Sequence, residues 1–233
     1  MIAASRFVFL HLHKSGGTFV NECIRRFVPG SRRVGYHLPR HEIPLELAAL
    51  PVLGIVRNPW SYYVSWFSFQ AARRQPNMLY RILSEDGRRD FGDTLRNLLA
   101  LGSGADNLDV LIEALPRAYG QRGINLPGFA LAPIRGSGLG FYSYLYRYMF
   151  GNENQMIRIG RMEMLREELP QMLEATGQPV SREMREFIET APPHNVARHA
   201  RYTEYYDSEL RSMVARRDAP IIARHCYRFG ECS

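Results

Sequence analysis

The stretch that decides the fold is FVFLHLHKSGGTF, which runs from Phe7 to Phe19. An apolar run of strand type, Phe7 to Leu12, leads directly into the turn His13 to Thr18. Apolar residues spaced three and four apart follow and predict an amphipathic helix: Phe19, Val20, Cys23, Ile24 and Phe27. A strand, a short turn with glycines and a helix form a geometry that binds anions, because the orphan N–H groups and the positive end of the helix dipole face the ligand.

The side chains of the turn fit an anionic ligand as well. Gly16 and Gly17 allow a tight turn and a close approach of the backbone, Lys14 brings a mobile positive charge, and the hydroxyls of Ser15 and Thr18 are neutral donors. The order of residues is not that of a Walker A loop, in which Lys follows the glycines, because here Lys14 precedes them.

This order resembles the HIPKTGGT-type 5′-phosphosulfate-binding loop of sulfotransferases. His11, Lys14, Gly16, Gly17 and Thr18 match that loop, Ser15 stands for Thr, Leu12 for Ile, and His13 stands where the family has Pro. The resemblance implies that the loop binds 3′-phosphoadenosine-5′-phosphosulfate (PAPS) through Lys14 and the backbone of Ser15 to Phe19. A generic strand-to-helix turn with an exposed Lys is the alternative interpretation.

A second motif follows another apolar run, Pro51 to Val56, which predicts a strand buried on both faces. Asn58 can cap the next helix, expected over residues 60–74, and Pro59 fits its first turn. The segment RNPWSYYVSWF resembles the 3′-phosphate motif of sulfotransferases, R-[DN]-P-x-x-R-x-x-S-x-[YF]. The resemblance implies that Arg57 and Ser65 bind the 3′-phosphate, whereas Tyr62 replaces the second Arg of the motif.

His37 is the candidate general base. Residues 32–37 predict a short second strand, and the carboxyl end of a strand in a parallel sheet is where α/β folds place their chemistry. The local G-x-H-x-P pattern resembles the position of the catalytic His in carbohydrate sulfotransferases. His41 is the rival base, and a hydrogen-bonded structural role is the alternative for His37.

The expected fold class is α/β: a three-layer, P-loop-like fold with a central parallel sheet flanked by helices and a helical insertion. The 233 residues suit a single sulfotransferase domain, 1–233. Residues 73–150 are interrupted by Gly and Pro and are interpreted as an acceptor-binding or lid insertion, with a plain helical appendage as the alternative. Residues 155–161 predict a further strand, and three helices are expected after it: 162–176, 181–190 and 207–217.

Composition and charge indicate the class of partner. The net charge is +7, with 30 Lys+Arg against 23 Asp+Glu, which favours an anionic ligand. No nucleic-acid partner is expected, because no clustered basic–aromatic motif is present. The sequence has neither a credible signal peptide nor an apolar run approaching 18 residues, so a soluble, cytoplasmic protein is expected.

The three cysteines, Cys23, Cys226 and Cys232, form no CxxC and no metal-binding spacing, so no metal is expected. Cys23 falls on the apolar face of the first helix and is interpreted as a core residue. Cys226 and Cys232 are close enough in sequence to pair, but free thiols are favoured. Near the C-terminus, a basic loop could close over the nucleotide, with a surface role as the alternative for each candidate: His194, Arg198 and Arg201.

These features together predict a transferase: a PAPS-dependent sulfotransferase in which His37 takes the proton of an acceptor hydroxyl and Lys14 stabilises charge on the leaving nucleotide. The resemblance favours a carbohydrate or glycoconjugate acceptor, while a small lipid, a phenol or a peptide tyrosine stays open.

Two other functional classes remain as alternatives. An ATP-dependent P-loop phosphotransferase would need Mg²⁺ and a Walker B Asp, and no apolar strand here ends in Asp. A non-catalytic nucleotide- or glycan-binding module would bind the nucleotide without transfer.

Overall fold

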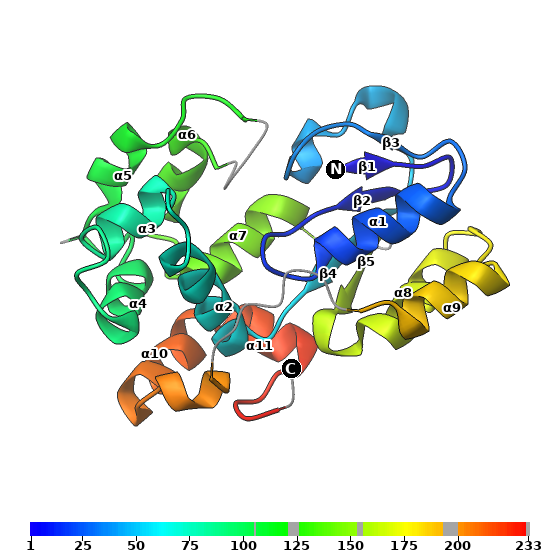
Figure 1. The fold of residues 1–233 in the computed structure, drawn as a ribbon. Coiled ribbons are helices and arrows are strands. Elements are labelled where there is room, and N and C mark those ends of the chain that lie inside the picture. Colours follow the sequence, from blue (N-terminus) through cyan, green and yellow to red (C-terminus); the bar gives the residue numbers. More distant parts are fainter. Residues whose placement is uncertain (105, 121–125, 153–155, 193–199, 232–233) are drawn as a thin grey trace. The chain divides into compact units, whose positions relative to one another are not determined.

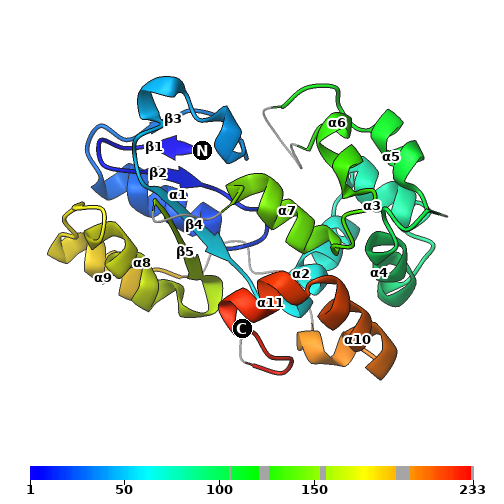
Figure 2. The ribbon, with the colours of Figure 1, turned by 180° about the vertical axis from the view of Figure 1, so that it is seen from behind.

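The structure is a computed structural model that describes residues 1–104, 106–120, 126–152, 156–192 and 200–231. The chain forms two compact units (Figures 1 and 2). The first unit comprises residues 1–57 and 148–196 and holds the β-sheet. The second comprises residues 58–147 and 197–233, and its described elements are helices.

The first unit alternates strands and helices. Its elements are β1 (Ile2–Ala3), β2 (Val8–Leu10), α1 (Gly17–Phe27), β3 (Arg32–Arg33), the 3-10 helices η1 (Arg40–Glu42) and η2 (Leu45–Leu47), β4 (Val52–Val56), β5 (Ile157–Arg161), the 3-10 helix η4 (Met162–Met164), α8 (Leu165–Glu174) and α9 (Arg182–Thr190).

The sheet has five strands in the order β3-β1-β2-β4-β5 (Figures 1 and 2). β4 pairs in parallel with β2 and β5, and its residues are all buried, as the apolar sequence VLGIV predicts. β1 is antiparallel to both β2 and β3. The α/β class with a mostly parallel central sheet is therefore confirmed, with an antiparallel edge that the sequence did not predict.

The strand expected over residues 32–37 is wrong beyond its first two residues. β3 contains only Arg32 and Arg33, both exposed, and pairs with the two residues of β1. The chain then folds back on itself, since a Cβ on Gly35 would lie 2.2 Å from Leu38 Cδ1. His37 has a φ of 48°, which is not extended backbone. It therefore lies in a loop and not at the end of a parallel strand.

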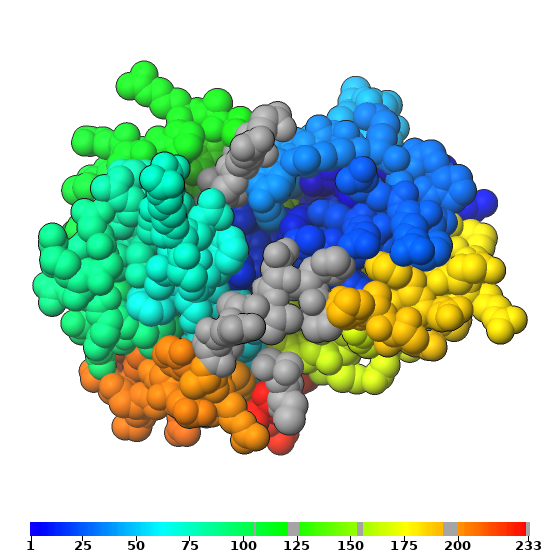
Figure 3. All heavy atoms as spheres, in the orientation of Figure 1, coloured from blue at the N-terminus to red at the C-terminus, as the bar shows by residue number. Residues whose placement is uncertain are grey.

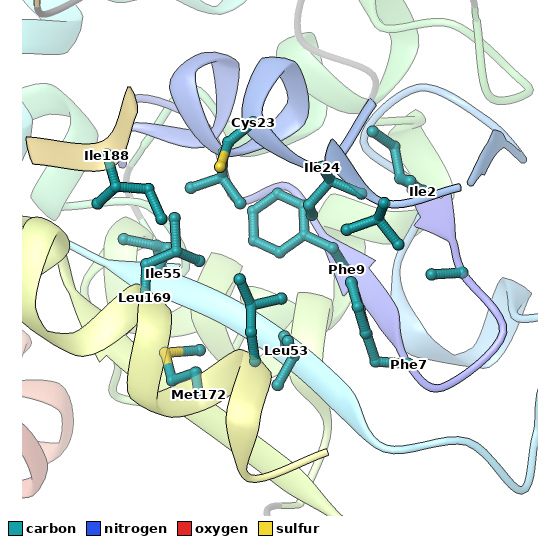
Figure 4. Close-up of a cluster of buried hydrophobic side chains, with 14 of the residues drawn as sticks. Ile2, Phe7, Phe9, Cys23, Ile24, Leu53, Ile55, Leu169, Met172 and Ile188 are labelled. Atoms are coloured by element: carbon teal, nitrogen blue, oxygen red, sulfur yellow. The ribbon is translucent and has the colours of Figure 1, made fainter. Parts of the chain in front are cut away.

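The core of the first unit lies between the sheet and the helices α1, α8 and α9 (Figure 4). The apolar stripe of α1 points into it, and Cys23 is fully buried there, as predicted. Burial of one large aliphatic or aromatic side chain stabilises a fold by about 1.5–3 kcal/mol, so this cluster fixes α1 against the strand that precedes it. On the surface of the unit, α1 and α9 lie side by side (Figure 3, blue and yellow).

The second unit begins with a capped helix. Its elements are α2 (Pro59–Ala71), α3 (Met78–Leu83), α4 (Phe91–Leu99), α5 (Leu108–Ala114), α6 (Gly128–Leu131), η3 (Ala132–Ile134), α7 (Phe141–Phe150, of which residues 148–150 belong to the first unit), η5 (Tyr202–Tyr205), α10 (Ser208–Arg217) and α11 (Ala219–His225). The Asn58 side chain accepts from the amides of Trp60 and Ser61, and Pro59 is the first helical residue, so the predicted cap is confirmed.

Most of the expected insertion, 73–150, falls in this second unit as residues 73–147, and the role of the insertion in acceptor binding or as a lid stays a prediction. The aromatic helix α7 is buried at most of its positions. α11 was not predicted. No helix among the described residues is long and apolar enough to cross a membrane.

Candidate functional site

The predicted anion loop connects β2 to α1, as the sequence indicated. Two of its residues, Lys14 and Gly16, have left-handed backbone with φ of 59° and 74°. Gly16 is the N-cap of α1, and its carbonyl accepts from the amides of Phe19 and Val20 at 3.1 and 3.4 Å. The amides of Gly17 and Thr18 precede these first hydrogen bonds of the helix, so this end of α1 is suited to an anion.

The packing of the His11 ring requires a glycine at position 17, which the sequence did not reveal. A Cβ added to Gly17 would lie 2.0 Å from His11 Cδ2, so the imidazole packs directly against the first turn of α1. His11 Nδ1 is also hydrogen-bonded to Asn21 Nδ2 at 3.1 Å. Gly17 is therefore required for the packing of His11, a requirement separate from any close approach of a ligand.

His37 contacts the loop, although its own segment is not a strand. Its Nδ1 donates to the carbonyl oxygen of His11 at 2.6 Å, and its ring lies 3.7 Å from the ring of His13, centroid to centroid. A carbonyl can only accept, so Nδ1 carries the proton and neutral His37 presents Nε2 as an acceptor. The structure thus brings the predicted base together with the predicted anion loop.

The protonation state of His37 is set by its surroundings. Burial lowers the pKa of His37 from 6.5 to about 4, while the hydrogen bond to His11 acts in the opposite direction. Burial also holds the pKa of His11 well below its ordinary value. His37 is therefore neutral at pH 7, which is the state that a general base needs before it accepts a proton.

The rival base, His41, lies elsewhere in the same unit. It belongs to η1, its ring meets the edge of Tyr148 at 5.3 Å, and its Nε2 is 4.0 Å from a carboxylate oxygen of Glu42. Its side chain is 54% exposed, in contrast to His37, which is 6% exposed. These contacts place His41 on the surface.

Two cations meet at the loop. Arg57 follows β4, is 8% exposed and donates from Nη1 to the carbonyl oxygen of Lys14 at 3.4 Å. Burial and the charge of Arg57 lower the pKa of Lys14 from 10.5 to about 8. Residues 43 positions apart are close because β2 and β4 are parallel neighbours, so the chain leaves both strands at the same edge of the sheet. A buried Arg57 beside a partly buried Lys14 favours an anion next to the two like charges.

The remaining loop residues differ in exposure. Ser15 is buried, and its hydroxyl donates to the carbonyl of His13 at 3.3 Å. Thr18 is exposed. The side chain of Phe19 packs in the core and stacks on Phe187, so only its backbone is part of the loop.

Ser65 lies on α2, in the second unit, and is 4% exposed. Its pairing with Arg57 on one phosphate stays a prediction that rests on the resemblance of their segment to the 3′-phosphate motif of sulfotransferases. Tyr62, at the position of the second Arg of the motif, is fully buried and stacks on Tyr142 with ring centroids 3.7 Å apart. It is thus a packing residue of the second unit.

Some of the residues singled out in the sequence lie outside the part of the chain that the structure describes. His194, Arg198 and Cys232 lie outside the described residues, whereas Arg201 is described and exposed. Cys226 is a free, exposed thiol. Within the described ranges, no group of three or more His, Cys, Asp or Glu side chains could hold a metal ion.

The comparisons with known proteins agree with the fold. No family model and no curated protein matches the chain. Among solved structures, it is similar to the crystal structure of mouse sulfotransferase SULT7A1 complexed with PAP, with a TM-score of 0.53. The sequences are 12% identical, and the match covers 95% of this chain and 88% of that chain. The chain therefore has the fold of a sulfotransferase.

Proposed function

We propose that the protein is a PAPS-dependent sulfotransferase. The observation that carries the proposal is the meeting of Lys14 and Arg57 at the loop before α1, within the fold of a sulfotransferase. Two nearby cations and a helix N-terminus fit the anionic ends of PAPS. The solved neighbour is complexed with PAP, which supports a nucleotide of the same class for this chain.

In this proposal, different residues contact different parts of PAPS. Lys14 and the amides of the loop hold the 5′-phosphosulfate, and Arg57 and Ser65 hold the 3′-phosphate. PAPS supplies the sulfuryl group. Lys14 is mostly protonated at pH 7 and stabilises negative charge that grows on the leaving nucleotide.

His37 takes the proton of the acceptor hydroxyl on Nε2, because Nδ1 is already used by the carbonyl of His11. The hydrogen bond to that carbonyl stabilises the imidazolium that forms, and a bound anion nearby raises the pKa of His37 above its value in the free protein. The low pKa of the free protein therefore keeps the base unprotonated until the donor is bound.

The acceptor is a hydroxyl compound. The resemblance of the His37 segment to carbohydrate sulfotransferases favours a sugar hydroxyl, and small-molecule hydroxyls are its competitors. We propose residues 73–150 as the segment that selects the acceptor.

A thermal-shift comparison tests the donor. Adenosine 3′,5′-bisphosphate (PAP), which remains when PAPS loses its sulfuryl group, is expected to raise the melting temperature at millimolar concentration, and ATP with Mg²⁺ is expected to leave it unchanged. Stabilisation by ATP–Mg²⁺ alone would support a phosphotransferase and contradict the proposal. Incubation with PAPS and a panel of sugars and phenols then identifies the acceptor; PAP binding without transfer to any of them, or to water, would indicate a binding module.

A further inference from the structure

His13 stands where the resembling family has Pro, and the proposed function gives it no role. Its side chain is buried, and its ring is nearly parallel to that of His37, with an interplanar angle of 13° and centroids 3.7 Å apart. It immediately precedes Lys14. The stack therefore joins the candidate base to the anion loop at the residue beside its lysine.

One hydrogen bond does not fix an imidazole. The bond from Nδ1 to the His11 carbonyl holds one edge of the ring, but a single hydrogen bond tolerates a partial rotation of the ring about its Cβ–Cγ bond, and the direction of Nε2 changes with that rotation. The left-handed backbone of His37, with φ of 48°, is also a conformation that non-glycine residues adopt only when their surroundings enforce it. A parallel ring at van der Waals distance removes the rotation, because leaving the plane would cost the whole stacking contact.

The other contacts of His37 do not replace this one. The ring of Tyr36 meets it edge-on at 86°, and the ring of His11 is tilted by 47°, both with centroids 4.2 Å away. Only a stacked ring restrains the plane of the imidazole over its whole face, and among the described residues His13 alone is stacked on it.

We propose that His13 is a positioning residue for His37: by stacking on it, His13 fixes the plane of the base and so aims Nε2 at the acceptor hydroxyl. This inference rests on the proposed function, in which His37 is the base. It concerns a residue of this chain that the resembling family does not share.

The stack also excludes water from one face of His37. Burial is the largest cause that lowers the pKa of His37, and the charges of the Met1 amino group, just before β1, and of Arg33 on β3 act in the same direction. The other titratable groups that face it are His11, His13 and Tyr36. Removal of the His13 ring alone would therefore hydrate His37 and raise its pKa from about 4 toward 6.5.

The first test is an NMR titration of the His37 imidazole, which needs neither PAPS nor an acceptor. In His13→Ala, the midpoint of His37 is expected to rise by about one pH unit or more, because water reaches the ring. In His13→Phe, which keeps a planar ring, the midpoint is expected to stay near that of the wild-type protein. His41→Ala is the matched control, since His41 is exposed and lies apart from the stack.

The second test is kinetic, with PAPS and the acceptor that the screen identifies, or water where it identifies none. His13→Ala is expected to lower kcat by about tenfold or more through misplacement of the base, while the Kd for PAP changes by less than about twofold. His13→Phe is expected to restore most of kcat. A loss of kcat without a loss of PAP affinity indicates a positioning role, because a structural role would weaken PAP binding as well.

An unchanged His37 midpoint together with an unchanged kcat in His13→Ala would overturn the inference. So would a His13→Phe variant as impaired as His13→Ala. A wild-type protein that neither binds PAP nor consumes PAPS would instead defeat the proposed function, and the NMR titration would still decide whether the His13 ring packs on His37 and shields it from water.

Discussion

Each of the two units contains a cluster of ionisable groups, and the two clusters differ in how their charge is compensated. In the second unit, Asp218 is fully buried and accepts from the hydroxyl of Tyr63 at 2.6 Å and from the amide of Ser143 at 2.8 Å. In the first unit, Lys14 and Arg57 bring two positive charges together beside the anion loop.

The difference lies in what balances the charge. Burial raises the pKa of Asp218, and hydrogen bonds from Tyr63 and Ser143 oppose that rise, so the protein itself compensates the carboxylate at the start of α7. For Lys14, burial and the neighbouring Arg57 act in the same direction, against the charge. A buried charge that is compensated by hydrogen bonds from the protein itself stabilises the fold. Like charges held close together lower the stability of the fold and indicate a site for a ligand of opposite charge.

The largest expected effect concerns the base. His37→Ala should lower turnover by about 10²–10⁴-fold, because a positioned general base contributes that much, while PAP affinity changes little. Steady-state kinetics with PAPS and calorimetric titration of PAP measure the two quantities. His41→Ala is the control and should behave as the wild-type protein. Wild-type turnover in His37→Ala would remove His37 from the role.

Asp218 should matter for folding instead. Asp218→Ala leaves the Tyr63 hydroxyl and the Ser143 amide without their acceptor, and each buried group left unsatisfied costs about 1–3 kcal/mol, so a loss of about 4 kcal/mol in unfolding free energy is expected. Urea denaturation measures it. Tyr63→Phe removes one donor to Asp218 and the acceptor of the Tyr142 amide but keeps the bond from Ser143 to the carboxylate, so it should lose less. An Asp218→Ala protein as stable as the wild type would contradict the structural role of the cluster.

The low pKa of His37 predicts a dependence of stability on pH. Because the pKa is about 4 in the folded protein and near 6.5 in the unfolded chain, the unfolded chain binds the proton first as the pH falls. The contribution of neutral His37 to the free energy of unfolding is complete above pH 6.5. It amounts to about 3 kcal/mol and is lost as the pH falls toward 4.

Urea denaturation between pH 7 and pH 4 tests this dependence, with His37→Phe as the comparison. The variant keeps a ring but cannot titrate, so the wild-type protein should lose about 3 kcal/mol more than the variant over that range. Parallel curves for the two proteins would show that the His37 imidazole is not held neutral by the fold.

The smallest expected effect is the pH dependence of PAP binding. Lys14 loses its proton above about pH 8 in the free protein, so PAP affinity should fall above that pH by up to about tenfold per pH unit. Lys14→Arg should bind PAP with an affinity that is flat over the same range, because an Arg stays protonated. A flat profile in the wild-type protein would place PAP away from Lys14.

The elements predicted correctly from the sequence are those whose signals are local. The strand–turn–helix around Lys14, the Asn58 cap and the buried face of α1 each depend on residues within a few positions of one another. β1 and β3 were missed or misjudged because two-residue strands have no periodicity; they exist only through pairing with neighbours distant in the chain.

The candidate site was predicted in part. The sequence predicts His37 at the end of a strand and in a G-x-H-x-P pattern, yet the residue reaches the loop through a left-handed turn and a hydrogen bond to His11. The packing of His11 on Gly17 and the stack of His13 on His37 are contacts between side chains, which no sequence pattern encodes. The approach of Arg57 to Lys14 follows from the pairing of parallel strands.

The most direct test of the account is calorimetric titration of PAP into the wild-type protein, Arg57→Met and Arg25→Met. Arg25 is exposed in the last turn of α1, at the end of that helix away from the loop, and serves as the control. Arg57→Met should weaken PAP binding by about 10–100-fold, the value of a charge-assisted hydrogen bond, and Arg25→Met should not. Equal affinity in all three proteins, or no binding to the wild type, would contradict the account.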